Sequence, residues 1–202
     1  MYVATLIANS KNRNLSELIL KQVVNDLGGV KYKVLDDNIA IDISLVSEPS
    51  NFEIVWKQLQ KHQIDMVLQP IKNRRKNILL ADMDSTMIEQ ECIDELADEA
   101  GVGKRVAEIT KRAMNGELDF EDALIERVKL LKGLSSDIIV NVLKGRITLM
   151  PGAESLIKTM KRNGSYCALV SGGFTDFTEA ISKMLGFDEN RANTLLHENE
   201  ML

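Results

Sequence analysis

The chain has 202 residues, of which 45% are hydrophobic and 27% are charged, and its formal net charge is −5 at pH 7. This length suits one large or two small folded domains. The negative charge argues against nucleic acid as the main partner, because phosphate backbones are bound by basic faces.

The first 75 residues alternate between strand and helix patterns. Along 15–27 the apolar residues Leu15, Ile19, Val23 and Leu27 recur on one helical face, which is typical of an amphipathic helix. We expect strands at 2–8, 31–35, 39–46 and 65–71, and helices at 15–27 and 52–63. The order β-α-β-β-α-β predicts an antiparallel sheet with two helices on one face. In this order of elements, residues 1–75 resemble the ACT-type regulatory domain.

Pro70 and the basic run 72–76 mark the expected boundary between 1–75 and 76–202. No aromatic residues interleave with the basic run, so we interpret it as a solvated linker rather than a nucleic-acid patch.

After the boundary the pattern changes to that of a parallel α/β fold. Residues 78–81 form a short, continuously apolar strand of the kind buried in parallel sheets. About sixty residues of helical periodicity follow, then a helix after 151–152, a strand at 166–170 and a helix ending at Gly186. We expect an α/β core over 76–202 with a helical cap inserted at about 88–150.

The two cysteines, Cys92 and Cys167, lie far apart and lack metal-type spacing. This usage fits buried thiols in a reducing cytoplasm better than a disulfide framework. No apolar run approaches the length of a membrane span, and the first 14 residues do not have the pattern of a signal peptide. His62 and His197 are isolated from other catalytic or metal-ligating residues. We therefore expect a cytoplasmic protein with no membrane partner.

Two aspartates follow the strand at 78–81. Asp82 and Asp84 come at its carboxyl end, where open α/β sheets form their ligand crevice, and alternation sends both side chains to the same side. Such a pair can hold Mg²⁺, or it can supply a nucleophile and a proton-transfer group. The competing interpretation is that the two carboxylates only cap the next helix, and the residues alone do not decide between these readings.

A second motif, Ser171-Gly172-Gly173, follows the apolar strand at 166–170 and precedes a helix. Its backbone N–H groups and its hydroxyl could hold an anion at the helix N-terminus. A plain glycine turn with a serine cap is the alternative. Together with Asp82 and Asp84, the motif favours a site for phosphoryl transfer.

These two motifs resemble those of the haloacid dehalogenase-like (HAD) phosphatases. The run DMDST at 82–86 matches their first motif, DxDx[TV], and 171–173 matches their second. Within that superfamily the chain most resembles the phosphoserine phosphatase family, through DMDSTMIEQECIDELADEAG at 82–101, AMNGELDFEDALIERVKLLKGL at 113–134 and LVSGGFTDF at 169–177. The resemblance covers roughly 76–202. It implies Mg²⁺-dependent hydrolysis of O-phospho-L-serine to L-serine and phosphate through an aspartyl-phosphate, the last step of serine biosynthesis.

The resemblance also implies roles for individual residues. Asp82 would be the nucleophile, and Asp84 would protonate the leaving serine oxygen and then activate water. Asp82 and the backbone carbonyl of Asp84 would bind Mg²⁺, and Ser171 and Gly172 would hold the phosphoryl group. Glu91 would bind the substrate ammonium.

Three further residues of the helical segment match the family. Arg127 would bind the substrate carboxylate, to which its planar guanidinium is well suited. Met114 and Phe120 align with apolar residues near the substrate, and packing in the core of the cap is the alternative for both. Without the family, Glu91 and Arg127 would be interpreted as surface charges on a helix.

The family pattern has two further parts that these 202 residues do not contain: a lysine beside the phosphoryl site and a GDGxND-like acidic motif at the metal. The run ANTLLHENEML at 192–202 resembles a strand segment that precedes both. We therefore expect a piece of a longer phosphatase that hydrolyses phosphoserine poorly by itself. We also expect the strand at 78–81 to have an uncovered apolar edge.

Two other functions remain open on the sequence. One is a HAD phosphatase for another small phosphate ester. The other is a non-catalytic serine- or amino-acid-binding regulatory protein with a degenerate HAD domain. The sequence leaves a homodimer possible.

Overall fold

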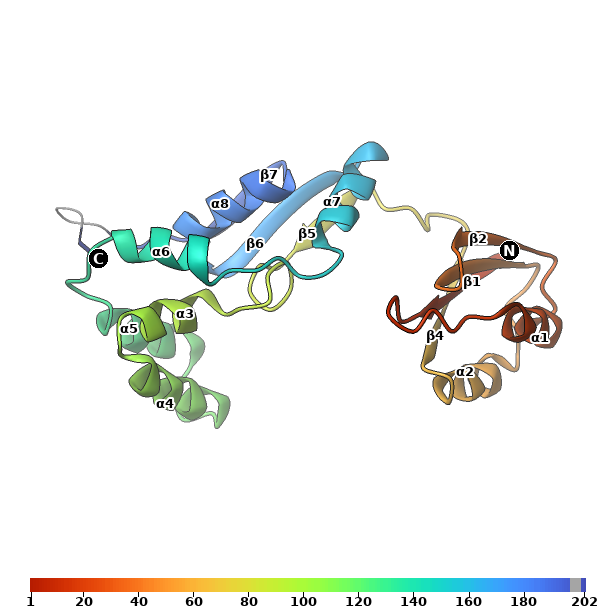
Figure 1. Ribbon diagram of the computed structural model, residues 1–202, viewed down its shortest axis with the longest axis horizontal. Helices are drawn as coiled ribbons and strands as arrows, with labels where there is room; N and C mark the ends of the chain where they lie inside the picture. Colours follow the sequence, from red (N-terminus) through yellow and green to blue (C-terminus); the bar gives the residue numbers. More distant parts are fainter. Residues whose placement is uncertain (197–200) are drawn as a thin grey trace. The chain divides into compact units, whose positions relative to one another are not determined.

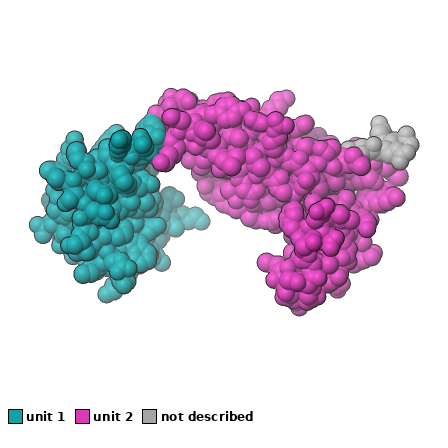
Figure 2. All heavy atoms as spheres, turned by 180° about the vertical axis from the view of Figure 1, so that it is seen from behind, with its two compact units in different colours: residues 1–75 teal, residues 76–202 magenta. Residues whose placement is uncertain are grey.

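The computed structural model describes residues 1–196 and 201–202, so 197–200, with His197, lie outside the described residues. Of the described residues in the strand segment expected at 192–202, only 192–193 belong to a strand, because β7 ends at Asn193. The chain divides into two compact units, Met1–Arg75 and Lys76–Leu202, which Figure 2 distinguishes by colour. Across the described ranges, no helix has the length and apolar character needed to cross a membrane.

Unit 1 is a four-stranded sheet with two helices (Figure 1). Its strand order is β2-β3-β1-β4, and every pair of neighbouring strands is antiparallel. The elements are β1 (Tyr2–Ala8), α1 (Glu17–Leu27), β2 (Lys31–Asp36), β3 (Ala40–Leu45), α2 (Phe52–Gln60) and β4 (Ile64–Pro70).

Local signals in the sequence explain the ends of α1. The Ser16 hydroxyl accepts a hydrogen bond from the backbone N–H of Ile19, which caps the start of the helix. Gly28 ends the helix in a left-handed conformation, with φ of 67°. The buried residues of α1 and α2 form one core with alternate residues of β1, β3 and β4, so both helices cover the same face of the sheet.

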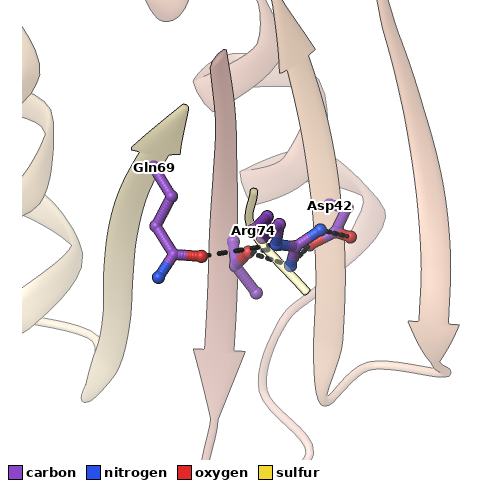
Figure 3. A network of polar contacts seen from close by, with 4 residues as sticks. Asp42, Gln69 and Arg74 are labelled. Carbon is purple, nitrogen blue, oxygen red and sulfur yellow. Dashed lines mark hydrogen bonds and ion pairs between the residues drawn. The ribbon is translucent and has the colours of Figure 1, made fainter. Parts of the chain in front are cut away.

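The opposite face of the sheet carries polar side chains, among them Thr5 and Asp42, beside apolar ones such as Val67, and Arg74 binds there (Figure 3). Figure 3 shows the Arg74 guanidinium lying across the strands, between Asp42 and Gln69. The interpretation of the basic run as a solvated linker is therefore wrong for Arg74, because an acidic residue on β3 binds its side chain.

Unit 2 contains a three-stranded parallel sheet in the order β5-β6-β7. Four helices, α3 to α6, lie in the chain between β5 and the next helix, α7 (Figure 1). The elements are β5 (Ile78–Ala81), α3 (Cys92–Glu99), α4 (Gly103–Met114), α5 (Phe120–Lys129), α6 (Asp137–Gly145), α7 (Ala153–Arg162), β6 (Tyr166–Phe174), α8 (Thr175–Leu185) and β7 (Glu189–Asn193).

The two faces of this sheet differ. Residues of one face, such as Ala81 and Leu169, are buried in the core of the unit. On the other face Ile78 and Leu80 are 69% and 67% exposed, and β5 forms one edge of the sheet. Parallel sheets are normally covered on both faces, so this bare apolar face at an edge strand is unusual.

The segments that enter and leave the four-helix segment lie side by side. Ile88 and Leu149 form an antiparallel bridge, and the backbone N–H of Glu89 donates to the carbonyl of Thr148 at 3.0 Å. The Gln90 side chain donates to the Thr148 hydroxyl at 2.8 Å and accepts from the Thr148 backbone N–H at 2.9 Å. The helical segment is thus joined to the sheet through a paired ribbon, 87–90 with 147–150.

Candidate active site

One pocket of unit 2, with a volume of about 240 Å³, contains the residues that the motifs single out. All six predicted site residues line it, and they come from the end of β5, from the helical segment and from β6. The lining consists of Asp82, Asp84, Glu91, Ile93, Phe120, Leu124, Arg127, Ser171, Gly172, Gly173 and Phe174. Paired carboxylates therefore lie in the same small pocket as an arginine and a glycine-rich loop.

The two aspartates have different environments. Asp82 accepts a hydrogen bond from the backbone N–H of Met83 at 2.8 Å. Asp84 accepts through Oδ2 from the backbone N–H of Cys92 at 3.3 Å, whereas its Oδ1 is buried and has no hydrogen-bond partner in the described part of the chain. Burial raises the pKa of Asp84 to about 6; the carboxylates of Glu91 and Asp82 add to this shift, and the hydrogen bonds from Cys92 oppose it. A carboxyl group with such a pKa suits proton transfer near neutral pH.

The contact with Cys92 bears on the alternative interpretation of these carboxylates. Cys92 is the first residue of α3, so Asp84 does bind the start of the next helix. It does so with Oδ2 only, because Oδ1 has no hydrogen-bond partner within the described residues, and Asp82 lines the pocket beside it. Capping and a functional site are therefore compatible here. Cys92 itself is fully buried, as expected.

The Ser171-Gly172-Gly173 loop differs from its expected form. We expected the strand to end at Val170 and the motif to open the helix, but β6 continues to Phe174 and α8 begins at Thr175. The pairing of β6 with β7 shifts register between Val170 and Phe174, so the motif forms an irregular strand end. The Ser171 hydroxyl accepts from the backbone N–H of Gly173 at 2.9 Å.

Gly173 is packed closely against Ser171 and Asp84. A methyl group built on it would lie 3.2 Å from Ser171 Oγ and 3.4 Å from Asp84 Oδ2. The loop and the acidic end of β5 are therefore in near contact, and a side chain at this position would push the Ser171 hydroxyl by a few tenths of an ångström.

The helical segment supplies the other charges of the pocket. Glu91 precedes α3 and accepts a hydrogen bond from the Ser85 hydroxyl at 2.6 Å. Arg127 lies on α5, and its Nε donates to the carbonyl of Ala123 at 3.1 Å, which leaves its terminal nitrogens for other partners.

The two apolar residues predicted near the substrate differ in position. Phe120 lines the pocket, and its ring lies 3.1 Å from a methyl group built on Gly172. Met114 is 85% exposed and is not among the residues that line the pocket. The alternative that both residues pack in a helical core is wrong, because Phe120 is also 65% exposed.

Sequence reasoning missed two residues that hold the site in place. Ser85, which orients Glu91, is one of the few non-glycine residues with positive φ, at 53°. Its place in the DMDST run was a usable signal. Asn193 on β7 donates to the carbonyl of Gly172 at 2.8 Å. No local pattern distinguishes Asn193, because its partner is 21 residues away in the sequence.

The haloacid dehalogenase-like hydrolase family model matches residues 79–200. The chain belongs to this family. It is 45% identical over 148 residues to a phosphoserine phosphatase of Archaeoglobus fulgidus, a match that covers 72% of this chain and 43% of the relative. A phosphoserine phosphatase of Saccharomyces cerevisiae is 33% identical over 207 residues, with 96% of this chain and 67% of the relative covered.

Among solved structures, the chain resembles a phospho-aspartyl intermediate analogue of phosphoserine phosphatase. The TM-score is 0.58 at 44% identity, and the match covers 64% of this chain and 61% of the other. The chain spans less than half the length of several curated relatives, with 43%, 40% and 32% covered in the proteins of Archaeoglobus fulgidus, Schizosaccharomyces pombe and Streptomyces coelicolor.

Membership of the family implies a divalent metal ion, and the pocket fits part of such a site. Asp82 and Asp84 both line the pocket, and the Asp82 carboxylate and the Asp84 backbone carbonyl offer the hard oxygen ligands that such ions prefer. Within 1–196 and 201–202, no group of three or more His, Cys, Asp or Glu side chains could hold a metal ion. The two aspartates therefore supply part of a ligand set.

Proposed function

We propose that the protein hydrolyses O-phospho-L-serine to L-serine and phosphate. The observation that carries this proposal is the meeting of Asp82, Asp84, Glu91 and Arg127 with the Ser171 loop in one pocket of about 240 Å³. Such a pocket suits a small ester with a phosphoryl group at one end and an amino acid at the other. The phosphoserine phosphatases among the relatives support the same substrate.

The chemistry proceeds in two displacements. A carboxylate oxygen of Asp82 attacks the phosphorus, the bond between phosphorus and the serine oxygen breaks, and Asp84 gives its proton to that oxygen. Water then attacks the phosphorus of the aspartyl-phosphate while Asp84 takes a proton from it. The bond between phosphorus and Asp82 breaks, and free phosphate leaves. The pKa of Asp84, about 6, suits a group that must give and take a proton in turn.

The remaining residues bind and orient. Ser171 and Gly172 hold the phosphoryl oxygens, and Asn193 keeps the Gly172 carbonyl in place. A divalent ion at Asp82 and the Asp84 carbonyl, for which we propose Mg²⁺, supplies positive charge beside the phosphoryl group when bound.

Two charged side chains of the helical segment bind the amino-acid end of the substrate. Glu91 pairs with the ammonium, and the Arg127 guanidinium pairs with the carboxylate. Four helices between β5 and α7 form a cap over the pocket, from which both residues reach the substrate.

We propose three further features of the whole protein. Unit 1 is an ACT-like domain, supported by its element order and its antiparallel sheet. The protein acts in the cytoplasm at the last step of serine biosynthesis, which fits its two free, buried cysteines. It forms a homodimer, which analytical ultracentrifugation of the whole protein can test.

Substrate recognition can be tested with two variants and two matched controls. Glu91→Ala and Arg127→Ala are compared with Glu108→Ala and Arg105→Ala, which alter exposed charges on α4. The assay measures phosphate released with Mg²⁺ from phosphoserine and from ethyl phosphate, which has no ammonium or carboxylate. Losing one charged contact should lower kcat/KM for phosphoserine roughly 10- to 100-fold.

The outcomes separate the candidate functions. A loss for phosphoserine with little change for ethyl phosphate supports the zwitterion site. Equal losses for both esters indicate a phosphatase for another small ester. Serine binding by calorimetry with no phosphate release from the protein of the complete reading frame indicates a non-catalytic binding protein. The 202-residue chain is assayed beside it, and equal rates would contradict the expectation that these residues alone turn over poorly.

A further inference from the structure

Arg74 makes an unusually complete set of polar contacts on unit 1. Its two terminal nitrogens donate to both carboxylate oxygens of Asp42, at 2.6 and 2.8 Å. One of them also donates to the Thr5 hydroxyl at 2.9 Å, and Nε donates to the Gln69 side chain at 3.3 Å. The Thr5 hydroxyl in turn donates to Asp42 at 2.7 Å. We call Arg74, Asp42, Thr5 and Gln69 the Arg74 clamp (Figure 3).

The clamp crosses three strands. Thr5 lies on β1, Asp42 on β3 and Gln69 on β4, and Thr5 and Asp42 are direct partners in the sheet. The side chains of Asp42 and Arg74 are only 14% and 33% exposed. Exposed ion pairs contribute little to stability, but a bidentate pair with this little exposure and two further hydrogen bonds holds its geometry much better.

The chain reverses direction to reach this position. After β4 ends at Pro70, the backbone N–H of Ile71 donates to the carbonyl of Met1, and that of Arg74 donates to the carbonyl of Ile71. Asn73 adopts a left-handed conformation, with φ of 61°. The turn brings the Arg74 side chain back over the face of the sheet that is opposite the helices. A left-handed residue between two bound ones marks a defined turn rather than a loose linker.

The next residues are fixed to unit 2 in the same way. The carbonyl of Lys76 accepts from the Ser165 hydroxyl at 2.8 Å, and the carbonyl of Asn77 accepts from the backbone N–H of Tyr166 at 2.8 Å. Ser165 is buried, so its hydroxyl is well held. Between the last residue bound to unit 1 and the first bound to unit 2 there is one residue, Arg75.

We propose that the Arg74 clamp is a conformational device that shortens the free connection between the two units to a single residue. With the clamp closed, the free path from Arg74 to Lys76 reaches at most about 7 Å; with it open, the path from Ile71 to Lys76 reaches about 17 Å. The clamp therefore confines movement of one unit relative to the other to the backbone around Arg75. It does not depend on the proposed phosphatase activity.

Limited digestion with trypsin tests the clamp, because trypsin cuts after Lys72, Arg74, Arg75 and Lys76. A protease needs several residues of unfolded backbone, so cutting in this segment should depend on opening of the clamp. Asp42→Asn removes the charge that binds Arg74 and leaves every trypsin site intact. We expect cutting between the units to become roughly 10- to 100-fold faster, as for the loss of a charged hydrogen-bonded pair. The matched control is Asp37→Asn, in the exposed turn between β2 and β3, which should behave like the wild type.

Two further measurements separate opening of the clamp from loss of the fold. Mass spectrometry locates the cuts, which should fall within 72–76 and not at the lysines of α1 and α2. Trp56 on α2 is the single tryptophan of the chain, so its fluorescence reports whether unit 1 remains folded. If Asp42→Asn unfolds unit 1, Thr5→Val tests the clamp in its place. This variant removes only the bridging hydroxyl and should accelerate cutting between the units by a smaller factor than the roughly 10- to 100-fold expected for Asp42→Asn. Wild-type cutting rates in folded Asp42→Asn or Thr5→Val would overturn the proposal.

Discussion

The bare face of the sheet in unit 2 predicts that the 202-residue chain associates with itself. Ile78 and Leu80 of β5 are 69% and 67% exposed, and Tyr166 and Val170 of β6 are 47% and 41% exposed. Because β5 is an edge strand, a second copy can approach both its face and its unpaired backbone. Leu80→Lys places a charge in the middle of this apolar surface and should suppress the association.

The exposed fractions of Ile78 and Leu80 give an order of magnitude for the free energy of association. Burying a whole Leu or Ile side chain is worth about 1.5–3 kcal/mol, so the two-thirds still exposed on Ile78 and Leu80 is worth roughly 1–2 kcal/mol each. A symmetric contact buries four such side chains and gains roughly 4–8 kcal/mol, against an association cost of at least about 4 kcal/mol. Backbone pairing along β5 adds to the gain. The difference is at most about 4 kcal/mol before backbone pairing is counted, so we expect a dissociation constant on the order of 1 mM.

Sedimentation velocity of the 202-residue chain at several concentrations measures this association. Leu80→Lys should weaken it at least about tenfold, because two like charges would have to be buried together. The matched control is Met184→Lys on α8, a residue that is 60% exposed and lies outside the sheet. The reasoning is wrong if Leu80→Lys and the wild type sediment alike at every concentration, or if Met184→Lys weakens association equally.

Three other expectations concern stability and the site. Burial raises the pKa of Asp42, but the hydrogen bonds and the charge of Arg74 outweigh burial and lower the pKa overall. The pair therefore stabilises unit 1 at neutral pH, and this stabilisation is lost as the pH falls below about 4. Denaturant titrations should show the wild type losing stability between pH 5 and pH 2 more steeply than Asp42→Asn; parallel curves would contradict the assignment. Leu96→Ala, at a fully buried position of α3, should lower the free energy of unfolding of unit 2 by about 2–5 kcal/mol in urea, and a loss below about 1 kcal/mol would show that the core there is loose. Asn193→Ala removes the hydrogen bond to the Gly172 carbonyl and should reduce kcat/KM for phosphoserine in the whole protein by about 3- to 10-fold with unfolding unchanged; unaltered kinetics would mean that the loop keeps its shape without Asn193.

The secondary structure of the chain follows closely from local patterns. The strands at 2–8 and 78–81 lie where apolar alternation and continuity predict them, because each is bounded by residues that favour turns. The second helix ends at Gln60 rather than at residue 63, because Lys61 and His62 bond to carbonyls three residues back and Gln63 has a φ of 56°. The hydrophobic periodicity of the sequence does not predict that the last turn of this helix tightens.

The site and the clamp differ in how far the sequence predicts them. Asp82, Asp84 and the Ser171 loop are recognisable because each belongs to a short motif at the end of an apolar strand. Arg74 looked like part of a solvated charge run because its partner Asp42 is 32 residues away, on another strand. Contacts between side chains that are distant in sequence depend on strand order and register, which no local pattern contains.

The paired ribbon at 87–90 and 147–150 has a consequence for how unit 2 can vary. Because Gln90 and Thr148 hold both ends of the helical segment at hydrogen-bonding distance, whatever lies between them closes the same short gap in the fold. The insertion is therefore attached to the core through two adjacent segments, 87–90 and 147–150. Because the first residue of α3 binds Asp84, α3 must keep its start, but the helices after it can be lengthened, shortened or exchanged while the aspartates at the end of β5 keep their places.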